Sequence, residues 1–123
     1  MAAVATCNWT GGSGQVYTYH VYELPASFDP NQPGNYIYAK VSPDKKWVPI
    51  YIGQGDLHDR CDPNVHHKGA CIRQKGSTHF HCHLNDSEEA RKAEEADLLA
   101  SNAEAYDPTG CLSTECMLLD LRS

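Results

Sequence analysis

Two strand-like runs separated by a short polar turn constrain the fold of this chain more than any other feature. Residues 35–41 (NYIYAKV) and 47–53 (WVPIYIG) are rich in β-branched and aromatic side chains, which favour strands. The segment between them, SPDKK, has the proline and aspartate that are typical of turns. Strands joined by so short a turn pair in an antiparallel fashion. We therefore expect an antiparallel β-hairpin over residues 35–53.

The remaining elements follow from periodicity and from capping residues. They are strands at 16–23 and 78–84, and helices at 57–61, 65–74 and 87–102. Asp56 is expected to cap the first helix, and Asp86 with Glu89 three residues later forms a capping box that opens the last one. This order of elements predicts an α+β fold, in which helices pack on an antiparallel sheet.

Length and hydropathy limit the class of protein. The chain has 123 residues, which is enough for one compact domain. Residues 1–15 are small and polar and are expected to form a flexible leader, with a single domain over 16–123. An apolar stretch at 117–121 is expected to pack back on that domain. The first residues lack the pattern of a signal peptide, and no apolar run reaches the ~20 residues of a membrane span, so the default expectation is a cytoplasmic location.

Charge is divided unevenly along the chain. The net charge of −6 argues against a general binder of polyanions. Residues 40–75, however, carry +3 from seven basic and four acidic side chains, whereas residues 86–123 carry −7 from ten acidic and three basic ones. Because phosphate binding depends on charge at short range, the middle third could form a phosphate-binding face.

Six cysteines and seven histidines raise the alternative of a structural zinc site. No two cysteines have CxxC spacing and there is no secretory signal, so we expect free buried thiols rather than a disulfide framework. Strict alternation in residues 78–84 places His79, His81 and His83 on one strand face. Same-face residues of a strand lie about 7 Å apart, so zinc would need ligands from another element. Exposed histidines beside a nucleic-acid groove are the favoured interpretation.

A second group of side chains has the chemistry needed to cleave a phosphodiester. It consists of Tyr36, Tyr51, Arg60, His66, His67 and Glu95. A tyrosine or histidine can take a proton from water, and the planar guanidinium of Arg60 can neutralise charge on a phosphate. Leu98 and Leu99 follow Glu95 at helical spacing, so we expect Glu95 to point inward and Glu94 to belong to a solvated face.

These residues occur in an order that resembles the GIY-YIG nuclease family. The resemblance runs from about residue 16 to 108 and is carried by Gly34-Asn35-Tyr36, Ile37-Tyr38, Tyr51-Ile52-Gly53, Gln54-Gly55, Arg60, His66-His67 and Glu95-Ala96-Asp97-Leu98-Leu99. It implies a small three-stranded antiparallel sheet flanked by helices, here with an extra N-terminal strand. It also implies an endonuclease that cleaves nucleic acid with a divalent metal, Mg²⁺ or Mn²⁺.

The same resemblance implies roles for individual residues. Tyr51 would act as general base, Arg60 would stabilise the phosphate, and Glu95 would bind the metal. The assisting side chains would be Tyr36, His66 and His67. Contacts to nucleic acid, with DNA favoured over RNA, are expected from Gly53, Gln54, Lys68, Arg73 and Lys75. A domain of this size offers few base contacts, so a homodimer or a partner protein is expected to supply specificity.

Other interpretations of these residues stay open at this point. The tyrosines could simply pack on one another, Arg60 could pair with Asp56, and Glu95 could pair with Arg91. The alternative functions are a GIY-YIG-like module that binds nucleic acid or protein without cleaving it, and a zinc-stabilised interaction domain.

Overall fold

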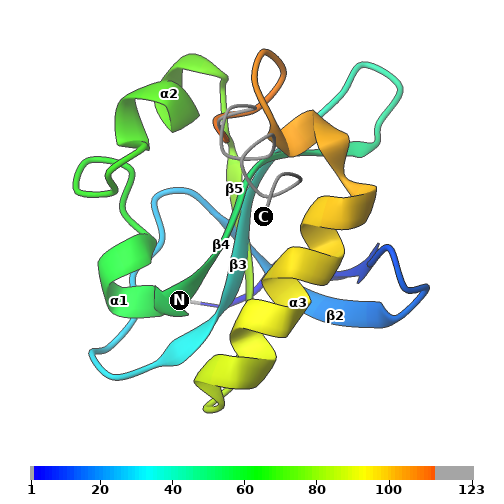
Figure 1. Ribbon diagram of the computed structural model, residues 1–123. Helices are drawn as coiled ribbons and strands as arrows, with labels where there is room; N and C mark the ends of the chain where they lie inside the picture. Colours follow the sequence, from blue (N-terminus) through cyan, green and yellow to red (C-terminus); the bar gives the residue numbers. More distant parts are fainter. Residues whose placement is uncertain (1, 113–123) are drawn as a thin grey trace.

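The computed structural model describes residues 2–112, which form one sheet with helices on both faces (Figure 1). The elements are β1 (Ala5–Thr10), β2 (Val16–Glu23), β3 (Pro33–Val41), β4 (Trp47–Asp56), α1 (Leu57–Arg60), α2 (Gly69–Gln74), β5 (His79–Leu84), α3 (Glu88–Ser101) and a 3₁₀ turn, η1 (Ala103–Ala105). The apolar stretch at 117–121 lies outside the described residues. Within the described part, no helix has the length and apolar character needed to cross a membrane.

The sheet has five antiparallel strands in the order β1-β2-β5-β3-β4. The predicted hairpin is present as β3 and β4, with Ile37 opposite Ile52. The expected three-stranded sheet is wrong, because β5 pairs with β2 on one side and with β3 on the other. The leader expected over 1–15 is wrong for residues 5–10, which pair with β2 as an edge strand. Trp9 anchors that strand in the core, although most of its neighbours are small and exposed.

A β-bulge in β4 changes which side chains face which layer. The register passes from Ala39 opposite Pro49 to Tyr38 opposite Tyr51, so Ile50 has no opposite residue in β3. Ile50 and Tyr51 consequently both join the core beneath α1 and α2.

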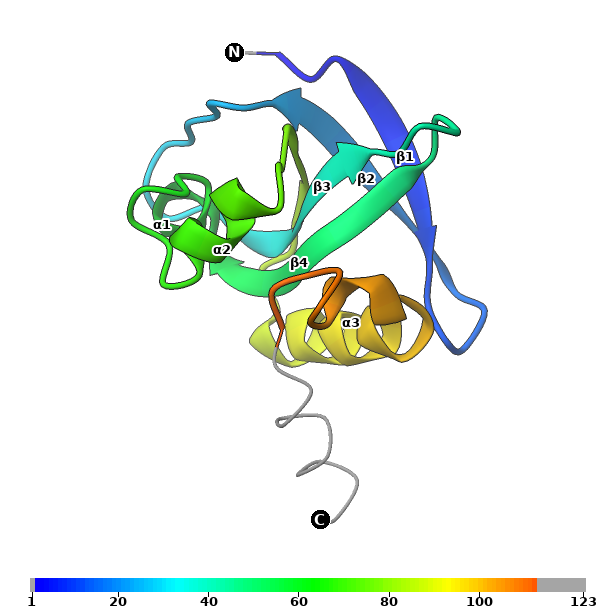
Figure 2. The ribbon, with the colours of Figure 1, turned by 90° about the horizontal axis from the view of Figure 1, so that it is seen from above.

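Both faces of the sheet are covered, with α3 lying along one of them (Figure 2). One face packs against α1, α2 and the loop between β2 and β3, around Tyr38 and Phe80. The other packs against α3 and η1, around Ile37 and Leu98. Because β3 is buried on both faces, residues 36–39 read as a continuous apolar and aromatic run rather than as an alternation.

The central strand β5 alternates as predicted, but the expectation that its histidines are exposed is wrong. His81 is fully buried, and its Nδ1 accepts a hydrogen bond from Trp9 Nε1 at 3.0 Å. Burial lowers the pKa of His81 to about 3, so this imidazole is neutral at pH 7. The ring of Trp47 also packs against it. Residues 2–112 contain no group of three or more metal-ligating side chains, so the zinc alternative has no ligand set there.

Two helices start later than the sequence predicts. The helix expected at 65–74 begins at Gly69, because the preceding residues form turns closed by backbone hydrogen bonds. In α3 the N-cap is Ser87, whose hydroxyl accepts the backbone N–H three residues on, rather than Asp86. The cap of α1 is Asp56, as predicted.

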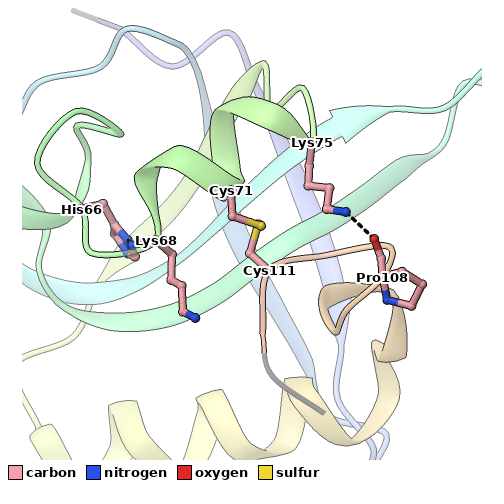
Figure 3. The surroundings of a disulfide bond; sticks show 6 residues. All are labelled: His66, Lys68, Cys71, Lys75, Pro108 and Cys111. Atoms are coloured by element: carbon pink, nitrogen blue, oxygen red, sulfur yellow. Dashed lines mark hydrogen bonds between the residues drawn. A yellow bond between two sulfur atoms is a disulfide. The ribbon is translucent and has the colours of Figure 1, made fainter. Parts of the chain in front are cut away.

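The expectation of free thiols is wrong for one pair of cysteines. Cys71 of α2 and Cys111 form a disulfide with a Cα–Cα distance of 5.8 Å (Figure 3). Cys7, Cys61 and Cys82 are free. The bridge spans 40 residues of sequence, so only the tertiary structure brings its two ends together.

Candidate active site

Tyr36 and Tyr51 lie side by side on the neighbouring strands β3 and β4. Their rings are stacked, with centroids 6.1 Å apart and planes inclined by 20°. Gly53 is opposite Tyr36 in the register, and a Cβ at Gly53 would come within 2.6 Å of the Tyr36 hydroxyl. The glycine of the Tyr-Ile-Gly motif therefore leaves the space that this hydroxyl occupies.

The loop before α2 brings two histidines to these tyrosines. Nε2 of His66 lies 2.8 Å from the Tyr36 hydroxyl, and Nε2 of His67 lies 3.4 Å from the Tyr51 hydroxyl. The two imidazoles are themselves stacked, with centroids 4.6 Å apart. His66 is buried and His67 is exposed. Each histidine thus contacts one tyrosine hydroxyl, and only the second faces solvent.

Hydrogen bonds determine which nitrogen of His66 carries the proton. The backbone N–H of Lys68 donates to Nδ1 of His66 at 2.9 Å. Burial, with the charges of His67 and Arg60, lowers the pKa of His66 to about 4, so the ring is neutral at pH 7. A neutral imidazole that accepts at Nδ1 carries its proton on Nε2. His66 therefore donates to the Tyr36 hydroxyl and has no lone pair left to accept another proton.

Arg60 ends α1, and its guanidinium lies against Gly55. A Cβ at Gly55 would lie 2.8 Å from Nε of Arg60, and the φ of 148° at this residue also favours glycine. The carbonyl of Arg60 accepts a hydrogen bond from the Tyr38 hydroxyl at 2.5 Å, which fixes the end of α1 on the sheet. The alternative ion pair with Asp56 is wrong, because that carboxylate accepts backbone N–H groups of the preceding loop and of α1.

Glu95 reaches the same place from α3. It is half-buried, and burial raises its pKa against the opposing influence of Arg60 and Lys92. Its alternative pairing with Arg91 is wrong, because the Arg91 guanidinium donates to Gln54 and to a backbone carbonyl. No hydrogen bond or ion pair within residues 2–112 uses the Glu95 carboxylate. A desolvated carboxylate of this kind is stabilised by a cation.

Electrostatic coupling joins these groups. Burial raises the pKa of Tyr51 and the charge of Glu95 raises it further, whereas Arg60 and a hydrogen bond with Tyr36 lower it. Burial also raises the pKa of Tyr36 far above its ordinary range, and the charges of Tyr51 and Arg60 act on it in opposite directions. Both hydroxyls are therefore protonated at neutral pH.

The residues expected to contact nucleic acid differ from one another in their surroundings. Gln54 accepts a hydrogen bond from Nε of Arg91 at 3.0 Å and so links β4 to α3. Arg73 donates to the backbone carbonyl of Pro63 at 2.7 Å, which closes the loop before α2. Lys68 precedes α2 beside His67, and its charge contributes to the lowered pKa of that histidine. The last two residues of this group are Gly53, which is buried, and Lys75, which donates to the carbonyl of Pro108.

The expectation that Glu94 is solvated is wrong. Its carboxylate is buried and accepts hydrogen bonds from the Tyr19 hydroxyl at 2.5 Å and from Nε2 of His83 at 2.6 Å. The hydrogen bond with Glu94 raises the pKa of His83. The buried stripe of α3 consists of residues 91, 94 and 98, a helical spacing that could have indicated this burial.

A groove of about 880 Å³ opens in another part of the surface. It lies between the β2–β3 loop and the strands β2 and β5, and its lining includes Tyr22, Phe28 and Cys82. None of the six clustered residues lines it. The cluster instead meets solvent at the edge strand β4, where His67 is exposed and Arg60 is partly exposed.

Comparison with protein-family models, with curated proteins and with solved structures gave no match. The class of protein therefore rests on the geometry above and on the resemblance of the motifs.

Proposed function

We propose that this protein is an endonuclease that hydrolyses phosphodiester bonds in nucleic acid with the help of a divalent metal, and that DNA is its substrate. One observation carries the proposal. Side chains from four separate parts of the chain lie near the guanidinium of Arg60, whose charge acts on Tyr36, Tyr51, His66, His67 and Glu95. Simple packing of tyrosines does not require an arginine and a half-buried carboxylate at the same place.

Arg60 is suited to hold the scissile phosphate. The planar guanidinium presents parallel N–H donors that match two phosphate oxygens. No hydrogen bond or ion pair within residues 2–112 uses the Arg60 guanidinium, so its donors remain available to a ligand.

Tyr51 and His67 offer a path for the proton of the attacking water. The Tyr51 hydroxyl is protonated, so it can take a proton from water only if it passes its own proton on. Nε2 of His67 is the acceptor within reach, because partial desolvation and the charges of Arg60 and Lys68 lower the pKa of His67 and keep its ring neutral. His66 has both nitrogens engaged, so its part is to orient Tyr36. The oxygen of the water then attacks phosphorus as the bond to the leaving oxygen breaks.

Glu95 is the residue that would hold the metal. Mg²⁺ is often bound through one or two carboxylates and keeps several waters. A single desolvated carboxylate therefore fits, even though the described part of the chain has no group of three ligating side chains. When bound, the metal would stabilise negative charge on the phosphate and the leaving oxygen.

Nicking of supercoiled plasmid with Mg²⁺ or Mn²⁺ tests the proposal. The native chain is compared with Glu95→Ala and with Glu89→Ala, a control at an exposed position of the same helix. We expect nicking by the native chain and by the control, and its loss in Glu95→Ala. Full metal-dependent nicking by Glu95→Ala would refute the assignment of the metal ligand.

A second candidate is a module that binds nucleic acid or protein without cleaving it. The net charge of −6 favours this candidate over a nuclease that binds polyanions broadly. It predicts saturable binding in a gel-shift or calorimetric titration, with no strand scission under any divalent metal.

A further inference from the structure

We propose that the Cys71–Cys111 disulfide is a reversible redox switch that keeps His67 in place over Tyr51. The proposal concerns two segments: the histidine loop, residues 62–68, and the C-terminal clasp, residues 103–112. The effect on cleavage rests on the proposed function, whereas the effect on the two segments does not.

The clasp is docked on β4 directly beside the site. The backbone N–H of Cys111 donates to the carbonyl of Ile50, the bulged residue that precedes Tyr51, at 2.8 Å. The clasp also closes on itself, because the N–H of Leu112 donates to the carbonyl of Ala105 at 2.9 Å. The disulfide therefore connects α2 to a segment that is already fixed to the strand carrying Tyr51.

The helix α2 depends on this connection. It has six residues, and helices of that length are not stable without tertiary contacts. Arg73 ties α2 to the histidine loop through Pro63 and Asn64. Beyond that loop, residues 69–75 have two polar or covalent links to other segments of the described chain, and both go to the clasp. One is the disulfide, and the other is the bond from Nζ of Lys75 to the carbonyl of Pro108, 2.6 Å long (Figure 3). Opening the disulfide leaves the buried side chain of Ile72, the bond of Lys75 and the hydrogen bonds from Arg73 to the histidine loop to hold the helix.

The histidine loop runs directly into α2, so movement of the helix reaches the site. The contact between His67 and Tyr51 is 3.4 Å long, at the outer limit of a hydrogen bond. A small displacement of α2 is enough to break it. The oxidised protein is therefore the competent form, and reduction lowers the rate of cleavage.

Thiol–disulfide exchange with a dithiol reductant opens the bridge. Cys71 is partly exposed, so a thiolate of the reductant can attack its sulfur, and Cys111 leaves as a thiolate that takes a proton from water. The second thiol of the reductant then displaces Cys71, and the reductant departs as a disulfide. A disulfide oxidant reverses both steps.

The experiment compares the native chain in its oxidised form with the same chain after treatment with dithiothreitol and removal of the reagent. Amide hydrogen exchange is followed by mass spectrometry, and plasmid nicking is measured on the same samples. Cys111→Ser represents the permanently open form, and Cys7→Ser is the control for loss of a cysteine that is free. We expect reduction to raise exchange in both segments and in α2 by about tenfold or more, while exchange in β5 stays unchanged.

The outcomes separate the two proposals. The switch is supported if reduction of the native chain speeds up amide exchange in both segments and oxidation reverses the change. Exchange in Cys111→Ser should not respond to reduction. Unchanged exchange in both segments overturns it. If the oxidised chain nicks DNA, reduction must lower the rate, and an unchanged rate also overturns the switch. Absence of nicking in both forms counts against the nuclease, and the exchange data then decide on the switch alone.

Discussion

The backbone N–H of Lys68 donates to Nδ1 of His66, and this bond gives two adjacent histidines different chemistry. It leaves His66 able only to donate, through Nε2, to the Tyr36 hydroxyl. His67 has no such constraint and faces solvent beside Tyr51. The two residues look equivalent in the sequence, but only His67 has a nitrogen that can accept a proton from the tyrosine beside it.

Replacing the two histidines separately tests this division of roles. We expect His67→Ala to lower the cleavage rate by about 100-fold, the usual contribution of a general base, with little change in stability. Added imidazole should restore part of that rate. His66→Ala should instead lower the free energy of unfolding by about 1–3 kcal/mol, because it removes a buried hydrogen-bonding partner. Rescue of His66→Ala by imidazole would contradict the assignment.

Acid should destabilise the protein below pH 6.5. The pKa values of His66 and His81, about 4 and about 3, lie below the unfolded value of 6.5. As pH falls, the unfolded chain therefore binds protons first, and each group lowers the free energy of unfolding by up to about 1.4 kcal/mol per pH unit. His83 has a raised pKa, so its contribution is present below pH 6.5 and is lost as pH rises through its folded pKa.

Urea unfolding at pH 7, 6 and 5 measures how steeply the free energy of unfolding falls as pH is lowered. His81→Phe is the informative variant, since it removes one titrating group while keeping an aromatic ring beside Trp47. The free energy of unfolding of this variant should fall less steeply as pH is lowered than that of the native chain. An identical slope in the two proteins would mean that His81 is not held neutral.

The neighbours Glu94 and Glu95 should respond in opposite ways to substitution. Glu94→Ala leaves the Tyr19 hydroxyl and His83 without their buried partner, so we expect a loss of about 3 kcal/mol in the free energy of unfolding. Glu95→Ala removes a half-buried carboxylate whose pKa is raised by burial, so stability should stay the same or increase. Thermal unfolding measures both. Equal destabilisation by the two changes would show that Glu95 has a structural partner.

Gly53→Ala should damage the site even though alanine is ordinarily better tolerated than glycine in a strand. The added Cβ would meet the Tyr36 hydroxyl at 2.6 Å and the edge of the Tyr51 ring at 3.0 Å. We expect a loss of about 1–3 kcal/mol, typical of overpacking, and a lower cleavage rate. Tyr36→Phe, which removes the hydroxyl without adding bulk, is the comparison. An unchanged stability of Gly53→Ala would show that the two tyrosines can move apart.

Local patterns predicted much of this fold. The bounds of β2 and the capping of α1 by Asp56 follow from strand propensity and from capping chemistry, both of which act between neighbouring residues. The position of β5 between the two hairpins could not be predicted in this way, because pairing partners are chosen by tertiary packing. The disulfide was missed for the same reason, since its cysteines are distant in sequence.

The resemblance singled out six residues of the candidate site, and these lie close together in the structure, while their catalytic roles stay predictions. The sequence could not reveal which neighbouring side chains carry out structural tasks. Helical spacing with Arg91 and Leu98 could have indicated that Glu94 is buried, but its binding to Tyr19 and His83 depends on which strands lie beneath α3. The pairing of Arg91 with Gln54 likewise depends on where α3 meets β4.

The extra residue at the bulge of β4 places two consecutive side chains, Ile50 and Tyr51, on the same face of the sheet. In a regular strand, residues four apart point the same way, so Trp47 and Tyr51 would share a face. Here Trp47 packs with His81 beneath α3, while Tyr51 faces the histidine loop. Deleting Ile50 would remove the bulge and leave Trp47 and Tyr51 three positions apart, still on opposite faces of the strand, but the core beneath α1 and α2 would lose one buried side chain. The inserted amino acid thus gives the face beneath α1 and α2 two consecutive side chains, Ile50 and Tyr51, while Trp47 stays on the α3 face.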